Sequence, residues 1–118
     1  MSEFVFLYRS TPEGRRNAMG SPEKAQQSLM KWRAWFKEMT DQGYVKNAGQ
    51  PLEDSGKVVG GSKRTITDGP YSETKDLIGG YSLIEARDLE QAAQIASGCP
   101  IIDNGGWVEV RPVRQMNI

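Results

Sequence analysis

The stretch from residue 4 to residue 9 constrains the fold most, because apolar side chains occupy both of its alternating sides. In an extended chain, one side carries Phe4, Phe6 and Tyr8, and the other carries Val5, Leu7 and Arg9. Successive side chains of a strand point to opposite faces of its sheet. Two largely apolar sides are typical of a central strand that is covered on both faces. We therefore expect this segment at the centre of a sheet, with packing partners on each face.

Two helices are predicted from their starting signals. Ser21-Pro22 joins a capping side chain to a proline at the first helical position, and Gly43 supplies a stop. Between them, apolar residues recur at steps of four and three, which is typical of a long amphipathic helix: they are Ala25, Leu29, Trp32, Phe36 and Met39, and Trp35 widens the stripe. Asp88, followed by Gln91 at the capping-box spacing, predicts a second and shorter helix.

The remaining segments predict strands and loops. Residues 44–50 are expected to form a strand or a strand-like approach, and residues 58–59 and 64–67 flank a plausible hairpin connection at residues 60–62. Further strands are expected at 81–86 and 107–113, whereas Pro12, Gly14 and Gly20 indicate a loop over 11–20. The order predicts an α+β fold of the ferredoxin-like βαββαβ type, with an antiparallel sheet and both helices on one face. We expect a single domain over residues 1–118.

This arrangement predicts a homodimer. Helices on one face leave the other face of the sheet uncovered, yet the first strand is apolar on both sides, and contiguous apolar patches usually mark an interface. Two sheets that face each other would enclose a cavity. Glu109 and Arg111 share one side of the last strand. They fit a polar lining of that cavity, or equally a solvent-exposed or interface ion pair.

Charge and composition narrow the classes of function. Fifteen basic and fifteen acidic residues cancel, so no overall field attracts nucleic acid or an anionic membrane. The first apolar run, residues 4–8, is too short for the core of a signal peptide, and no stretch approaches the roughly 20 apolar residues of a membrane span. A cytoplasmic protein is the expectation. The tight basic pair Arg15-Arg16 is interpreted as part of a solvated loop.

The absence of histidine limits the chemistry further. The chain has no histidine, which excludes Ser-His-Asp and Cys-His nucleophilic systems and histidine-ligated metals. Cys99 is the single cysteine, so no internal disulfide is possible, and we interpret it as a packed thiol at a helix end. We expect no metal, haem or flavin.

One segment has more polar groups than a turn requires, and it is our candidate site. It reads Thr67-Asp68-Gly69-Pro70-Tyr71-Ser72-Glu73-Thr74-Lys75 and is followed by Gly79-Gly80-Tyr81. With the apolar start, the long helix and the closing residues 108–112, this string resembles the DGPF branch of the YCII-related family of small bacterial proteins. Tyr71 stands where that branch usually has phenylalanine, and the histidine associated with YCII proteins is absent, so histidine-based catalysis is not carried over.

The resemblance implies a dimeric α/β barrel and makes Asp68 a site acid, either as a catalytic proton acceptor or as a ligand-binding carboxylate. From the residues alone, an Asx-type turn explains Asp68 equally well. Likewise, Glu73 and Lys75 either orient a ligand or form a surface pair. We expect further ligand contacts from Tyr8, Arg9, Tyr71 and Arg111.

The expected function is the binding or transformation of a small oxygenated or anionic organic molecule in the dimer cavity. Non-metal acid–base chemistry would use Asp68 as the base and Arg111 or Lys75 to stabilise a developing anion. The alternative is a ligand-sensing or protein-interaction module without turnover. The resemblance links such a module to extracytoplasmic-function sigma factors, because genes of the family often lie beside theirs.

Overall fold

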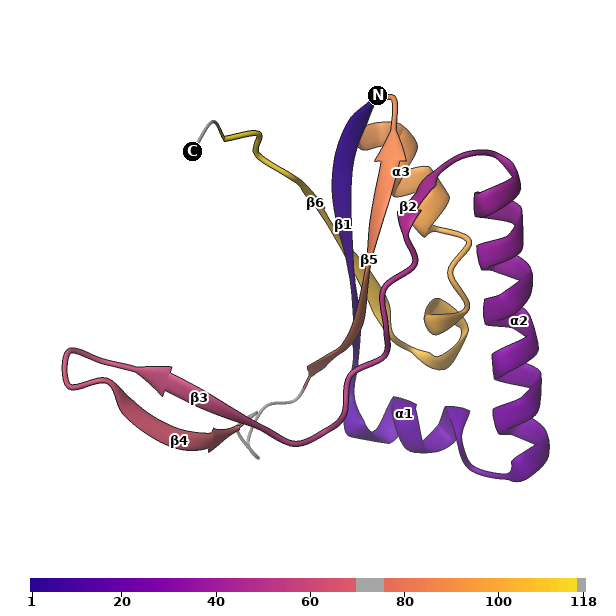
Figure 1. Ribbon diagram of the computed structural model, residues 1–118. Helices are drawn as coiled ribbons and strands as arrows, with labels where there is room; N and C mark the ends of the chain where they lie inside the picture. The colour runs from indigo at the N-terminus through magenta and orange to yellow at the C-terminus, as the bar shows by residue number, and fades with distance from the viewer. Residues whose placement is uncertain (70–75, 117–118) are drawn as a thin grey trace.

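The computed structural model describes residues 1–69 and 76–116. Its main sheet has four antiparallel strands in the order β2-β5-β1-β6, so the first strand lies inside the sheet as predicted (Figure 1). The strands are β1 (Ser2–Ser10), β2 (Val45–Asn47), β5 (Leu77–Ala86) and β6 (Trp107–Pro112).

Both predicted helices form, and they lie on the same face of the sheet (Figure 1). They are α2 (Pro22–Asp41) and α3 (Leu89–Ala96). The Ser21 hydroxyl accepts a hydrogen bond from the backbone N–H of Lys24 at 3.1 Å, and Asp88 accepts one from that of Gln91 at 2.8 Å. The capping signals therefore act as the sequence indicated, and the ferredoxin-like βαββαβ fold is confirmed.

The predicted loop over residues 11–20 is wrong, because most of it forms helix α1 (Pro12–Ala18). Thr11 accepts a hydrogen bond from the backbone N–H of Gly14 at 3.0 Å, and Pro12 occupies the start of the helix. Thr11-Pro12 is the same starting signal as Ser21-Pro22. The stabilisation from this start outweighs the conformational free energy that Gly14 costs inside the helix.

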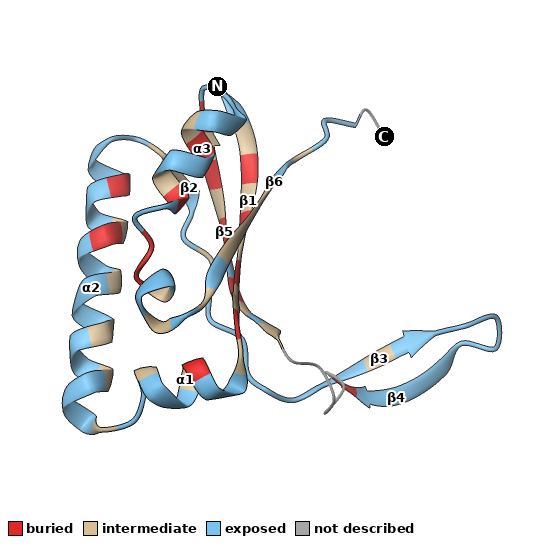
Figure 2. Ribbon diagram, turned by 180° about the vertical axis from the view of Figure 1, so that it is seen from behind, coloured by how far each residue is buried: buried red, intermediate tan, exposed pale blue. Residues whose placement is uncertain are grey.

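The core lies between the sheet and the helices (Figure 2). On β1 the side chains facing the helices are buried, whereas Val5 and Leu7 on the other face are half-buried. In α2, Trp35 and Met39 are buried, but Leu29 is 49% exposed. The apolar stripe of α2 is therefore packed in its C-terminal half, while its N-terminal half stands away from the core.

A separate hairpin projects from this body, on the side away from α2 (Figure 1). It consists of β3 (Gly56–Gly60) and β4 (Thr65–Gly69), which confirms the hairpin predicted around residues 60–62. The first residues of the candidate turn, 67–69, belong to β4. The rest of that turn, residues 70–75, lies outside the described residues.

Candidate functional site

A large cavity lies between α1, α2 and the edge of the sheet, and it is open to solvent. Its volume is about 1500 Å³. Helix α1 connects the end of β1 to the start of α2 (Figure 1). A helix of seven residues is about 10 Å long, so α1 holds the first turns of α2 away from the sheet. The helix that the sequence analysis missed is thus the element that creates the cavity.

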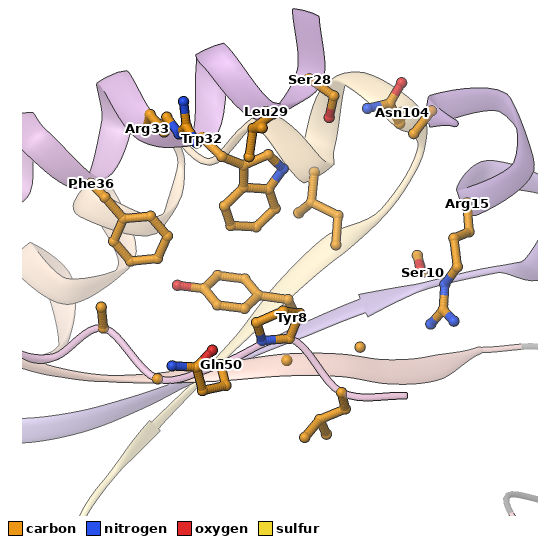
Figure 3. A pocket seen from close by; sticks show the side chains of 18 of the residues that line it. Tyr8, Ser10, Arg15, Ser28, Leu29, Trp32, Arg33, Phe36, Gln50 and Asn104 are labelled. Carbon is orange, nitrogen blue, oxygen red and sulfur yellow. The ribbon is translucent and has the colours of Figure 1, made fainter. Parts of the chain in front are cut away.

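Aromatic rings gather in one part of this cavity (Figure 3). Trp32 and Phe36 of α2 have ring centroids 6.0 Å apart. The ring of Tyr8 on β1 packs edge to face against Trp32, with 5.0 Å between the centroids. The Tyr8 hydroxyl donates to Ser82 Oγ at 2.8 Å, and the Ser82 hydroxyl donates to the Ala48 carbonyl at 2.7 Å. Burial raises the pKa of the Tyr8 hydroxyl, so it is a neutral phenol at physiological pH.

A partly buried cation, Arg15 of α1, lies in another part of the cavity, beside Ser10 (Figure 3). A Cβ atom at Gly79 of β5 would lie 3.1 Å from the Arg15 Nη2 atom, so the absence of a side chain there makes room for the guanidinium group. Arg15 forms an ion pair with Asp54, and their side chains are 29% and 73% exposed. The cavity therefore combines apolar walls with one sheltered positive charge.

The segment 48–54 forms the wall of the cavity that carries Asp54. The Leu52 backbone N–H donates to the Gly79 carbonyl at 2.8 Å, and Pro51 forms a β-bridge with Gly80, so this segment runs along β5. Gly49 has φ +73°, and a side chain there would collide with the Tyr81 carbonyl. A glycine is required because the backbones approach so closely.

Among the described candidates from the sequence, Tyr8 alone lines this cavity. Arg9 and Arg111 lie on the opposite, open face of the sheet, where both bond to Glu109, at 2.6 Å and 3.3 Å. Arg9 also donates to Asp76 at 3.0 Å and 2.7 Å. These hydrogen bonds to Asp76 and Glu109 raise the pKa of Arg9. The open face thus carries a compact charge cluster that is separate from the cavity.

Asp68 lies on the projecting hairpin. Its side chain is 90% exposed and pairs with Lys57, directly across the two strands, at 2.5 Å. Tyr71, Glu73 and Lys75 are outside the described residues. The roles expected for these four residues stay predictions.

Arg15 is the site residue that sequence reasoning missed. The sequence alone places Arg15 and Arg16 in a solvated loop, but in the structure only Arg16 of this pair is exposed, and Arg15 is half-buried. The signal that could have located it is the Thr11-Pro12 helix start, which places Arg15 on a helix. The interpretation of Cys99 as a packed thiol is confirmed: it is 2% exposed, and burial raises its pKa to about 12.

Residues 1–69 and 76–116 contain neither a clustered metal-ligand set nor a membrane-spanning helix. Within these ranges, no group of three or more histidine, cysteine, aspartate or glutamate side chains is placed to hold a metal ion. Over the same part of the chain, no helix has both the length and the apolar character needed to cross a membrane.

Comparison with known proteins agrees with the fold and the pattern of the sequence. The model of the YCII-related domain matches residues 4–117, so the chain belongs to the YCII-related family. No curated protein matches the sequence.

A solved structure with a similar fold is 5-chloro-2-hydroxyhydroquinone dehydrochlorinase (TftG) from Burkholderia phenoliruptrix AC1100, in complex with 2,5-dihydroxybenzoquinone. The TM-score is 0.57 and the sequence identity 13%, over 97% of this chain and 95% of that one. At this identity the likeness shows the fold alone.

Proposed function

We propose that this protein binds a small oxygenated or anionic organic molecule in the cavity between α2 and the sheet. The observation that carries this proposal is the combination of aromatic side chains with the partly buried cation of Arg15. Concave sites with mostly apolar walls and a few polar groups are typical of small-molecule binding. The rings of Trp32 and Phe36 offer apolar contact, and Arg15 offers charge.

The helix-side cavity is preferred to a cavity between two sheets because a single chain forms it. The structure contains one chain, so the cavity between two sheets stays a prediction. The ligand class has support from the complex of TftG with 2,5-dihydroxybenzoquinone, which is a small oxygenated ring. We carry over that class of ligand, and not the reaction.

A thermal-shift screen tests binding. We would use benzoate, salicylate, catechol, 2,5-dihydroxybenzoquinone and succinate with the wild type and two variants. Leu29→Trp puts a bulky ring on the cavity wall, whereas the matched control Val59→Trp changes an exposed position of the hairpin. The proposal expects a shift that is lost in Leu29→Trp and kept in Val59→Trp. No shift with any compound, or an equal shift in both variants, would contradict it.

Turnover is the second question, because the expected acid–base chemistry needs a carboxylate at the ligand. Any compound that binds would be incubated with the wild type and with Asp68→Asn, and its consumption followed by chromatography. Asp68 lies on the hairpin and is not part of the cavity lining, so consumption that disappears in Asp68→Asn while binding persists would require the hairpin of a second copy to reach the ligand. Binding without consumption would favour the ligand-sensing alternative.

A further inference from the structure

We propose that Arg15 binds the carboxylate of an aromatic acid, and that Asp54 occupies the place of this carboxylate when the cavity is empty. This inference rests on the proposed function and specifies its ligand.

The Arg15 guanidinium is held in position before any ligand arrives. It extends from α1, whose start is capped by Thr11, and Gly79 leaves the space that it occupies over β5. Gly14 fixes α1 on its other side, because a Cβ atom there would lie 2.8 Å from the carbonyl oxygen of Asn104. A planar guanidinium group matches a carboxylate with two parallel N–H donors. Arg15 therefore needs little reorganisation to receive one.

The ion pair with Asp54 shows that this guanidinium binds a carboxylate that lies on the cavity wall. The Asp54 carboxylate stands in for the acid group of the ligand. Its side chain is 73% exposed. Ion pairs to exposed carboxylates are weak, because water and salt screen them, so a second carboxylate can displace Asp54.

The rings of the cavity give an aromatic acid an advantage that Asp54 lacks. Trp32 and Phe36 are half-buried, so their rings remain available for contact with a ring inserted beside Tyr8 (Figure 3). Aromatic pairs gain both apolar burial and favourable edge-to-face or offset geometry. An aromatic monocarboxylate offers a group to each part of the cavity, whereas an aliphatic acid offers one to the cation alone.

The other cationic side chains of the lining are less suited to this role. Lys37 pairs with Asp41 at 2.8 Å, and both side chains are largely exposed, at 76% and 62%. Arg33 is also exposed. A single sheltered cation favours one carboxylate over a phosphate or a dicarboxylate, which need more positive charge for neutralisation.

Isothermal titration calorimetry tests this inference with benzoate, benzamide and benzyl alcohol, which share a ring and differ in charge. We expect the wild type to bind benzoate about tenfold or more tightly than benzamide, the ratio typical of one hydrogen bond to a charged group. Arg15→Gln should remove this preference, and Arg16→Gln, one residue along the same helix, should keep it. Asp54→Asn should tighten benzoate binding several-fold, because the competing carboxylate is gone.

The wild-type comparison of benzoate with benzamide does not depend on the folding of any variant. Equal binding of the two, or a preference that survives in Arg15→Gln, would overturn the assignment of Arg15 while leaving the proposed function intact. Weaker or unchanged benzoate binding in Asp54→Asn would overturn the displacement. If none of the compounds in the thermal-shift panel binds, the proposed function itself fails.

Discussion

Tyr8 belongs both to the hydrophobic core and to the lining of the cavity. Its ring packs against Trp32 and Trp35, and its hydroxyl begins the hydrogen-bonded chain through Ser82 to the Ala48 carbonyl. These two hydrogen bonds fix the segment 48–54 relative to β1, since Ala48 is the first residue of that segment.

Tyr8→Phe keeps the ring and removes the first hydrogen bond of this chain. We expect the free energy of unfolding to fall by about 1 kcal/mol, the usual net value of such a bond. Urea denaturation measures this. A variant as stable as the wild type would show that the Tyr8–Ser82 bond contributes nothing.

Cys99 gives the stability a defined dependence on pH. Burial raises the pKa of its thiol from the ordinary 9.0 to about 12, so in the unfolded chain the thiol loses its proton at lower pH than in the folded protein. The contribution is fully present below the unfolded pKa and is lost as pH rises toward the folded pKa. The loss reaches at most about 1.4 kcal/mol per pH unit.

Cys99→Ala should therefore lose stability less steeply with pH than the wild type. Urea unfolding of both proteins, at intervals from about pH 8 to pH 10.5, measures the two slopes. Parallel slopes would contradict the raised pKa, whatever the difference in stability at neutral pH.

At the scale of elements, α1 determines both the width of the cavity and the position of Arg15. Thr11→Ala removes the cap of α1 and should cost about 1 kcal/mol of stability. It should also weaken benzoate binding, because Arg15 lies one turn further along the helix. Asp88→Ala removes the cap of α3, outside the cavity lining, and is the matched control.

Denaturation and calorimetry on both variants separate the two effects. We expect similar losses of stability, with weaker binding in Thr11→Ala alone. Equal binding in the two variants would mean that α1 does not position the site.

The sequence predicted the elements whose signals are local and strong. The two-sided apolar pattern of β1 and the capping residues of α2 and α3 led to the correct fold. It did not predict α1, because Gly14 and Gly20 are typical of a loop and mask the Thr11-Pro12 helix start. With residues 11–20 as a loop, Arg15 has no defined direction, and the spacing of apolar residues in α2 does not indicate that the N-terminal half of the stripe stands away from the core.

The candidate site was predicted even less completely, for a physical reason. Tyr8 was named, but the Arg15–Asp54 pair joins residues 39 positions apart, and no periodicity in the sequence indicates such a contact. The cavity itself depends on the distance between α2 and the sheet. That distance is a property of the assembled fold.

At the scale of the whole molecule, the open face of the sheet supports the predicted homodimer as a proposal. Leu7 lies between Tyr81 and Glu109 in register, and it is half-buried although none of the described helices covers it. The β3–β4 hairpin extends on the side away from α2, with Val59 and Ile66 62% and 66% exposed (Figure 1). An isolated two-stranded hairpin is marginally stable alone, so contact with a second copy would stabilise it.

Light scattering tests the dimer at micromolar concentration. We expect a dimer for the wild type and a monomer for Leu7→Glu, because the new charge would be buried in the interface beside Glu109. Ala34→Glu places the same charge on the exposed side of α2 and should remain a dimer. A monomeric wild type would remove both the dimer and any cavity between the sheets.

The central claim is that the cavity between α2 and the sheet is the ligand site, and nuclear magnetic resonance tests it most directly. Benzoate would be titrated into ¹⁵N-labelled protein while the backbone amide signals are followed. We predict that the shifts concentrate at Ser10, Arg15, Trp32, Phe36 and Asp54. Shifts confined to the β3–β4 hairpin and Asp68, or to Arg9, Glu109 and Arg111 on the open face, would contradict the account.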